Sequence, residues 1–216
     1  MKVFLMFIVM VFLNTKTYAD PKARWIGFSF NGSSCEGEET GYGPYDFIDP
    51  KTRSKFLVVE KYHFTKKVEL LRAGRSGTLP SDLDYTLRAV PNHHRALLSV
   101  IRYQIKYLNK LKRKKLLVPP ECYLQRAINF NPKDAALYVL YGYYLEKNNR
   151  LKEASRKYKK ALLMQPNYSK FEYAYSLLLI KLKKYNEALK FAKLAYKHGK
   201  PPDGLKKKLI KIGVWK

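Results

Sequence analysis

The sequence is poor in cysteine and in acidic residues, and it lacks the short motifs that mark many enzymes. Two cysteines in 216 residues are too few for a disulfide-rich miniprotein or a four-cysteine zinc site. The 11 glycines and 11 prolines exclude collagen-like and low-complexity chains. The sequence contains no Walker loop, GxGxxG, HExxH or GxSxG motif. The best-known fingerprints of phosphate binding, dinucleotide binding, zinc proteases and hydrolases are therefore absent.

The composition is strongly basic. There are 43 lysines and arginines against 17 aspartates and glutamates, which gives a formal net charge of +26. This excess predicts attraction to polyanions, although it says nothing about the fold. Hydrophobic residues make up 46% of the chain and charged residues 28%. We therefore expect one good-sized domain with a buried core, with or without a smaller second one, rather than a disordered chain.

Residues 1–19 have the three parts of a secretory signal peptide. Lys2 gives a positive start, residues 3–13 are an unbroken apolar run, and a polar stretch ends in Thr17-Tyr18-Ala19. The apolar run is shorter than the roughly 20 residues that a membrane-spanning helix needs. We predict cleavage after Ala19 and a periplasmic or secreted protein, with an uncleaved anchor as the alternative.

Export changes the interpretation of the two cysteines. Cys35 lies in a loop-like segment rich in glycine, serine and glutamate, and Cys122 lies in a segment with helical character. In an oxidising compartment two lone cysteines most simply form a disulfide. In the chain-entropy model a bridge over so long a loop contributes roughly 4 kcal/mol. The alternatives are two free thiols or a catalytic cysteine, although no helper motif surrounds either residue.

The C-terminal half contains a repeated pattern of small and aromatic residues. In residues 135–166, Gly142, Ala154, Tyr158, Ala161 and Pro166 are separated by 12, 4, 3 and 5 residues, as in helix–turn–helix repeats of 34 residues. Small residues at these positions let paired helices approach closely, and proline ends the second helix because it lacks an N–H. After a shift of 34 residues the equivalent residues are Ser176, Ala188, Ala192 and Ala195, with Pro201 one residue late. A pair of ordinary amphipathic helices is the alternative.

Weaker forms of this pattern flank the two repeats. On the N-terminal side, Ala127 and Pro132 hold their positions, but Ile101 and Pro120 stand where small residues are usual. We infer a seven-residue insertion there, a first helix over residues 94–115, and a preceding half repeat over residues 81–91 with Ser81 as its N-cap. On the C-terminal side, a plausible helical stripe predicts a closing helix. Its members are Leu205, Leu209, Ile212 and Trp215.

Residues 20–80 carry turn signals and two short helical candidates. The better candidate covers residues 65–72, with Thr65 as N-cap and Gly74 as its stop signal. This segment is too thin for a core of its own, so we expect it to wrap against the repeats.

The frame over residues 135–201 resembles the tetratricopeptide (TPR) repeat family. The whole mature chain is also similar to a group of exported bacterial TPR proteins of unsettled function, through its GYGPYDF, EKYHFT and DLDYTLRAVPNHHRAL segments and its G-x-W end. The resemblance implies an all-α fold, a right-handed TPR-type α-solenoid with two clear repeats, one irregular repeat, one half repeat and a closing helix. The expected division is a signal peptide (1–19), an irregular N-terminal segment (20–80) and the helical domain (81–216). The concave face of such a solenoid binds peptides or protein partners, and the resemblance implies no catalytic residues.

In TPR proteins the concave groove is lined by the second, fifth, ninth, twelfth and thirteenth positions of the first helix of each repeat. The matching residues here are Arg95, Leu98, Arg102, Ile105 and Lys106, then Ala136, Val139, Tyr143, Glu146 and Lys147, then Lys170, Tyr173, Leu177, Ile180 and Lys181. We predict that the basic and tyrosine members bind the partner: Arg95, Arg102, Lys106, Tyr143, Lys147, Lys170, Tyr173 and Lys181. They suit an acidic, partly apolar segment or its C-terminal carboxylate. The alternative is that they are ordinary solvated helix residues.

The sequence leaves two other functions open. The charge is densest between Arg102 and Lys115, where seven cations occur without an acid, so this cluster could bind anionic lipid, glycolipid or polymer. Export argues against specific nucleic-acid binding, and a lysine run is most often a solvated face. A metal site or hydrolase could be built from His63, His93, His94 and Asp84. Adjacent histidines on a helix point about 100° apart and seldom bind one ion together. We therefore predict no metal, no cofactor and no enzymatic activity.

Overall fold

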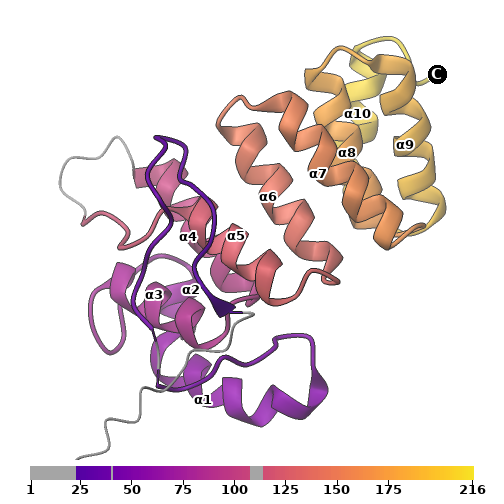
Figure 1. Ribbon diagram of the computed structural model, residues 1–216. Helices are drawn as coiled ribbons and strands as arrows, with labels where there is room; N and C mark the ends of the chain where they lie inside the picture. The colour runs from indigo at the N-terminus through magenta and orange to yellow at the C-terminus, as the bar shows by residue number, and fades with distance from the viewer. Residues whose placement is uncertain (1–22, 40, 108–113) are drawn as a thin grey trace, which may run out of the picture.

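The computed structural model describes residues 23–39, 41–107 and 114–216. Within these ranges the regular structure is helical apart from one isolated antiparallel bridge between Phe28 and Ser34, which confirms the predicted all-α class (Figure 1). The helices are η2 (Pro50–Thr52), α1 (Arg53–His63), α2 (Lys66–Glu69), α3 (Leu79–Ala89), α4 (His94–Tyr107), α5 (Pro120–Phe130), α6 (Ala135–Lys147), α7 (Leu151–Met164), α8 (Ser169–Lys181), α9 (Tyr185–Lys197) and α10 (Gly204–Lys211). No helix in the described part of the chain combines the length and the apolar character needed to cross a membrane. The predicted signal peptide lies outside the described residues.

Two helical hairpins, α6 with α7 and α8 with α9, stack in the C-terminal half (Figure 1). The small residues of the predicted frame lie inside them. A Cβ atom added to Gly142 would lie 3.2 Å from the ring of Tyr158, so a larger side chain there would have to displace this ring. The other frame residues, Ala154, Ala161, Ala188, Ala192 and Ala195, are all fully buried. The sequence frame is therefore the packing frame of a TPR-type α-solenoid.

The two hairpins turn at equivalent residues. Asn149 and Lys183 both have a left-handed backbone, with φ of +58° and +59°. Asparagine adopts this conformation readily, whereas lysine adopts it at a cost. The next amide, that of Arg150 or Lys184, donates a 2.9 Å hydrogen bond to a carbonyl five residues earlier. The same turn is thus made by different residues, which shows that helix packing decides its geometry.

The irregular repeat consists of α4 and α5, and α3 lies before it in the place of the half repeat. The described part of α4 ends at Tyr107, and residues 108–113 lie outside the described residues. Residues 114 and 115 are not helical, so the expectation of a helix reaching residue 115 was wrong. The chain at residue 114 instead lies back against α4, where the Tyr103 hydroxyl donates a 2.5 Å hydrogen bond to the Lys114 carbonyl. The N-cap of α3 is Thr78 rather than Ser81, because the Thr78 side chain accepts a hydrogen bond from the Ser81 amide. The helix starts early because Pro80 suits a first turn.

The N-terminal segment is more helical than the sequence indicated. Its main helix is α1, which has 11 residues. In the predicted region 65–72 only the four residues of α2 are helical. Thr65 occupies the N-cap position without a side-chain capping bond, and Leu71 has a left-handed φ of +57°. The chain therefore leaves the helical conformation before Gly74, and the predicted stop signal was wrong.

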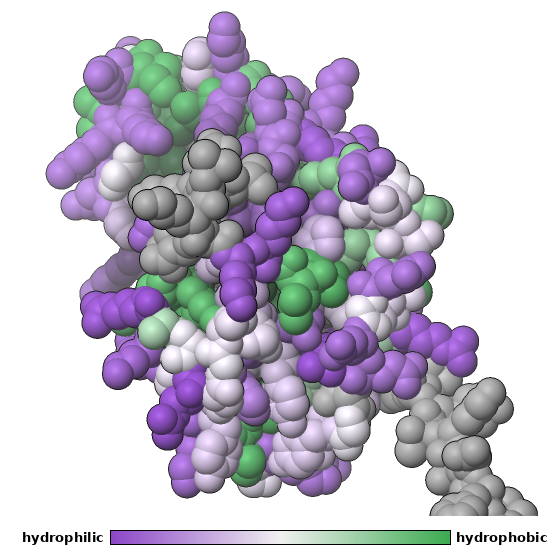
Figure 2. Space-filling model, turned by 90° about the vertical axis from the view of Figure 1, so that its left-hand side faces the viewer, coloured by the Kyte–Doolittle hydropathy of each residue, from purple (hydrophilic) through white to green (hydrophobic). Residues whose placement is uncertain are grey.

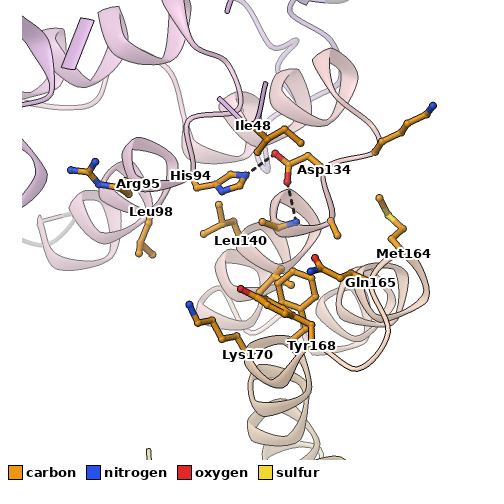
Figure 3. A pocket seen from close by; sticks show the side chains of 15 residues that line it. Ile48, His94, Arg95, Leu98, Asp134, Leu140, Met164, Gln165, Tyr168 and Lys170 are labelled. Carbon is orange, nitrogen blue, oxygen red and sulfur yellow. Dashed lines mark hydrogen bonds and ion pairs between the residues drawn. The ribbon is translucent and has the colours of Figure 1, made fainter. Parts of the chain in front are cut away.

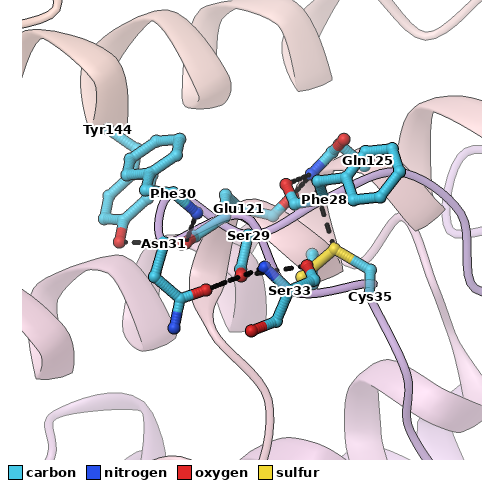
Figure 4. The surroundings of a disulfide bond; sticks show 10 residues. Phe28, Ser29, Phe30, Asn31, Ser33, Cys35, Glu121, Gln125 and Tyr144 are labelled. Carbon is cyan, nitrogen blue, oxygen red and sulfur yellow. Dashed lines mark hydrogen bonds between the residues drawn. A yellow bond between two sulfur atoms is a disulfide. The ribbon is translucent and has the colours of Figure 1, made fainter.

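A disulfide fastens residues 23–39 to α5, as predicted for Cys35 and Cys122. Their Cα atoms lie 5.3 Å apart, and 87 positions separate them in the sequence (Figure 4). Beside the bridge, the buried carboxylate of Glu121 accepts hydrogen bonds from the Phe30 amide (2.8 Å) and the Tyr144 hydroxyl (3.0 Å). One carboxylate thus joins the N-terminal segment, α5 and α6.

The buried guanidinium of Arg126 holds the beginning of the described chain. It donates hydrogen bonds of 2.7 Å to the carbonyls of Ala23 and Leu87, and it lies 4.8 Å from the ring of Trp25. Burial lowers the pKa of Arg126 to about 10. The residue therefore remains charged at neutral pH and ties residue 23 to α3 and α5.

Polar side chains of the GYGPYDF and PNHH segments meet in a buried hub. The amide group of Asn92 donates to Asp46 (2.6 Å) and Asp134 (3.2 Å), and its carbonyl accepts from the Phe47 amide (2.9 Å). Asn92 is completely buried. This hub fixes the N-terminal segment against the start of α4 and the loop before α6.

The last helix closes the solenoid. Leu205 and Leu209 of α10 are completely buried, and α10 packs on α8 and α9. Trp215 continues this cover, with its ring 5.5 Å from the ring of Tyr196 and almost perpendicular to it. The predicted closing helix is confirmed, and it covers the apolar face that another repeat would otherwise bury.

Candidate functional site: the concave groove

A hollow of about 670 Å³ lies between the starts of α4, α6 and α8 (Figure 3). Five of the positions that the TPR resemblance assigns to a groove line it. They are Arg95 and Leu98 of α4, Ala136 and Val139 of α6, and Lys170 of α8. The three first helices of consecutive repeats thus present their side chains to one space. We call this space, together with the second hollow described below, the concave groove.

The walls of this hollow are largely apolar and its rim is basic. Leu98, Val139, Leu140 and Phe171 supply hydrophobic surface. Lys133 and Lys170 are both exposed, and neither forms an ion pair within the described parts of the chain. A partner in this space would therefore meet apolar surface in the middle and uncompensated positive charge at the edge.

Asp134 is the acidic residue among those that line the hollow, and its carboxylate already has hydrogen-bonding partners. Asp134 is 4% exposed, and its Oδ2 atom lies 2.6 Å from Nε2 of His94. Its Oδ1 atom accepts a hydrogen bond from the Ala136 amide and caps α6 (Figure 3). Because these groups satisfy the carboxylate, Asp134 orders the wall of the hollow and leaves Lys133 and Lys170 unpaired.

A second hollow, of about 310 Å³, lies further along α4 and α6. It is lined by Arg102, Ile105, Lys106 and Tyr143, with Glu69, Leu70 and Leu71 from the N-terminal segment. The ammonium group of Lys147 lies 5.3 Å from the centre of the Tyr143 ring. The structure therefore gathers Arg102, Lys106, Tyr143 and Lys147 at this end of the concave groove.

Two of the predicted binding residues are engaged in pairs within the protein. Arg95 forms a two-pronged ion pair with Glu69, with both N–O distances at 2.9 Å, and it also contacts Glu60. The hydrogen bond from Arg95 lowers the pKa of Glu69 to about 2. Lys181 forms an ion pair of 2.6 Å with Glu146, which joins α8 to α6. Both cations therefore hold elements together as well as bordering the groove face.

Tyr173 lines neither of these two hollows and lies with Lys170 in a third one, of about 310 Å³. This hollow is shared with Tyr168, Lys170 and the Pro201–Pro202 turn between α9 and α10. Burial raises the pKa of Tyr173, so its hydroxyl stays protonated and can donate a hydrogen bond. Lys170 lines both this hollow and the larger one.

The sequence analysis assigned only five of the 15 residues that line the larger hollow to a groove (Figure 3), and three of those it missed show why. Ile48 reaches it from the N-terminal segment, Lys133 from the loop before α6, and Tyr168 from the loop before α8. All three lie outside the first helices from which groove positions are counted. A usable signal existed for Lys133, because Asp134 reads as an N-cap and places the preceding side chain at the end of α6. Nothing local could have placed Ile48 there.

The histidines that suggested a metal or hydrolase site lie in separate pairs. His63 pairs with Asp82 (2.9 Å), His93 with Glu60 (2.9 Å) and His94 with Asp134 (2.6 Å). Asp84 is bonded instead to Tyr123 and Arg88. Burial lowers the pKa of His93, against the opposing effect of Glu60. Across residues 23–39, 41–107 and 114–216, no group of three or more histidine, cysteine, aspartate or glutamate side chains could hold a metal ion.

The described surface around the irregular repeat is mainly hydrophilic on one face. On the face shown in Figure 2, hydrophilic side chains surround small, separated hydrophobic areas. Exposed apolar residues such as Phe28 and Leu117 lie far apart in the sequence, whereas Leu57, Val58 and Tyr62 share α1. Exposed apolar residues are normal on a protein surface, and the concave groove combines its apolar walls with convergent cations, so it is the better candidate site.

Comparison with known proteins gives only distant structural similarity. No family model matches the sequence, and no curated protein matches it. A solved structure of MamA MSR-1 has 20% identity, covering 65% of this chain and 72% of that chain, with a TM-score of 0.43. A point mutant of MamA has 18% identity over 71% of this chain and 100% of that chain, with a TM-score of 0.38, and a crystal structure of MamA has 19% identity over 76% and 99%, with a TM-score of 0.42. The stacked hairpins and their buried small residues, described above, are those of a TPR-type α-solenoid.

Proposed function

We propose that the protein is a non-enzymatic interaction module of the bacterial cell envelope, and that it binds an extended, acidic and partly apolar protein segment in the concave groove. The observation that carries this proposal is the convergence of α4, α6 and α8 on one hollow with apolar walls and a basic rim. An extended segment suits this shape because its alternate side chains can meet the walls while its acids meet the rim.

The charge distribution supports an acidic partner. Lys133 and Lys170 stand at the larger hollow, and Arg102, Lys106 and Lys147 stand at or beside the smaller one. Cations arranged around a partly desolvated surface suppress basic partners and favour acidic ones.

The alternative site, the cluster between Arg102 and Lys115, is less well supported. Two of its members, Arg102 and Lys106, line the smaller hollow of the groove. Lys114 and Lys115 are exposed, and the cluster members in residues 108–113 lie outside the described residues. Of the described members of the cluster, two therefore belong to the groove, whereas Lys114 and Lys115 line neither of its hollows.

Export is part of the proposal. The disulfide between Cys35 and Cys122 supports it, because such bonds persist in oxidising compartments. Intact-mass measurement of the protein recovered from the envelope, without reductant, would test both points. Cleavage after Ala19 and the loss of two hydrogens are expected, whereas a full-length, thiol-containing chain would contradict export.

Peptide binding tests the groove directly. The probe is a fluorescent peptide in which acids alternate with leucine and phenylalanine, compared with the same peptide carrying lysine in place of each acid. We expect fluorescence polarisation to show binding of the acidic peptide only. Lys133→Glu with Lys170→Glu should weaken binding at least tenfold, because two attractive contacts become repulsive.

The matched control is Lys152→Glu with Lys159→Glu, an equal change of net charge on exposed positions of α7, outside the groove. Val139→Glu tests the apolar wall independently. Equal loss of binding in the control, or unchanged binding in both groove variants, would show that the peptide is held by net charge or elsewhere.

A further inference from the structure

A second surface of the protein has a pattern of its own. On α7 and α9 the buried residues Ala154 and Ala188 mark the inner side of each helix. The opposite side of each helix is exposed and basic. Its main cations are Arg156, Lys159 and Lys160 on α7 and Lys190, Lys193 and Lys197 on α9. We call these six residues the outer basic face.

The outer basic face follows the repeat. Arg156 is 34 positions before Lys190, and Lys159 is 34 positions before Lys193. Equivalent positions of stacked repeats project in the same direction because the hairpins have the same geometry. The cations of α7 and α9 therefore point outwards together, away from the packed core.

Acids do not neutralise this face. Glu153 is paired with Arg150 at the start of α7, and Glu187 is paired with Lys184 at the start of α9. Glu172 is buried and contacts His198. None of the six cations forms an ion pair with any residue that the structure describes. The face is also distinct from the concave groove, to which α7 contributes Met164 at its end.

Apolar side chains project among the cations. Leu163 is 80% exposed and follows Lys159 and Lys160 by one helical turn. On the neighbouring α10, Ile210 is 51% exposed and lies among Lys206, Lys207, Lys208 and Lys211, which are all exposed. Between residues 151 and 211 these two are the large hydrophobic side chains that are exposed, and neither is aromatic.

This composition suits a lipid surface better than a nucleic acid. Lysines beside projecting aliphatic side chains bind anionic headgroups while the aliphatic groups enter the interface. Single-stranded nucleic acids are usually held by exposed aromatic rings on which bases stack. Specific reading of duplex bases relies on planar arginine or amide groups, and five of the six cations are lysines.

We propose that the outer basic face, extended by α10 at the end of the solenoid, docks on a bilayer that contains anionic phospholipids. The concave groove is formed mainly by α4, α6 and α8, whereas the docking cations lie on α7 and α9. Docking on the bilayer therefore leaves the groove open to a protein segment. This proposal does not depend on the function proposed for the groove.

Vesicle co-sedimentation of the full-length mature protein tests the proposal. The probes are vesicles of phosphatidylcholine alone and of phosphatidylcholine with phosphatidylglycerol. We expect binding to the anionic vesicles only, with weakening as salt rises. Arg156→Gln with Lys190→Gln should reduce the partition coefficient roughly 25-fold, since each cation near such a surface contributes about fivefold.

Lys114→Gln with Lys115→Gln is the matched control, because it removes the same charge from exposed positions outside the outer basic face. Its partition coefficient should stay within about twofold of the unaltered protein. Equal loss in this control would show binding by net charge alone and would overturn the proposal. Binding to the neutral vesicles that matches binding to the anionic ones would overturn it as well.

Leu163→Ser distinguishes a bilayer from a free polyanion. We expect it to weaken vesicle binding, most clearly at high salt, and to leave the binding of duplex DNA unchanged. If the Arg156/Lys190 variant instead weakens binding of duplex DNA and leaves vesicle binding intact, the face serves nucleic acid and the lipid proposal fails. All altered side chains are exposed, so circular dichroism should show an unchanged fold in every variant.

Discussion

The hydroxyl of Ser176 donates a 2.7 Å hydrogen bond to the carbonyl of Ala188, across the two helices of the last hairpin. Ser176 is completely buried and stands 34 positions after Gly142. In the earlier hairpin the glycine lets Tyr158 pack against the helix backbone. In the last hairpin the residue equivalent to Tyr158 is Ala192. The smaller side chain leaves room for the Ser176 hydroxyl, which bridges the two helices instead.

Enlarging Gly142 should therefore destabilise the solenoid. We expect Gly142→Leu to lower the free energy of unfolding by about 2 kcal/mol, because the new side chain would overlap the Tyr158 ring. Urea denaturation followed by circular dichroism measures this change. Gly204→Leu is the control, since a Cβ atom there would meet only the Tyr173 hydroxyl at 3.8 Å. Similar stabilities for the two variants would show that the close approach at Gly142 is not required.

Loss of the polar hub should destabilise the protein somewhat more. We expect Asn92→Leu to lower the free energy of unfolding by about 3 kcal/mol, because the Phe47 amide and the Asp134 carboxylate lose a buried partner. Asn186→Leu, an exposed position on α9, should change it by less than about 0.5 kcal/mol. Thermal unfolding of both variants checks this prediction, and an Asn92 variant as stable as the control would contradict it.

Reduction of the disulfide should loosen the N-terminal segment from α5. The bridge spans 87 positions, and the chain-entropy model then gives a stabilisation of about 4 kcal/mol. We expect urea denaturation with and without reductant to show a difference of up to this size, with faster proteolysis within residues 23–39 after reduction. The double variant Cys35→Ser, Cys122→Ser should match the reduced protein and should not respond to reductant. A reductant effect that persists in this variant would assign the loss to another cause.

Acid should remove the contribution of the Glu69–Arg95 pair. The carboxyl pKa of Glu69 is lowered from 4.5 to about 2, first by its hydrogen bond from Arg95. The folded state therefore favours the ionised carboxylate, and this stabilisation is fully present above pH 4.5 and is lost as the pH falls towards 2.

The matching measurement is the thermal midpoint of Glu69→Gln across that pH range. The variant should be less stable than the unaltered protein at neutral pH, and the difference should shrink between pH 4.5 and about 2. The same substitution at Glu36, an exposed loop residue, should give no such convergence. A constant difference at all pH values would mean that Glu69 stabilises α2 by packing rather than by charge.

The features that the sequence predicted correctly are those that repeat or that have one simple pairing. Gly142, Ala154 and Ala161 mark the hairpin because their spacing is local and recurs after 34 residues. Cys35 and Cys122 had only each other as disulfide partners. Helix α10 was predictable because its apolar residues have helical spacing and the last hairpin needs a cover.

The N-terminal half was harder to predict because distant residues fix it. Asp46 is held by Asn92, and the Ala23 carbonyl by Arg126, 103 positions later. No local pattern encodes such pairs. The groove was predicted only where it is built from first helices, as at Leu98 and Val139. Its loop members depend on how separate elements meet in space.

The long reach of Arg126 has a consequence for the order in which contacts can form during synthesis. Ala23 and Cys35 are synthesised before their partners in α5, from which 103 and 87 positions separate them. Neither the hydrogen bond to Arg126 nor the disulfide can form until α5 has been made. Residues 23–39 therefore complete their native contacts late, after the helices that follow them in the sequence have begun to assemble.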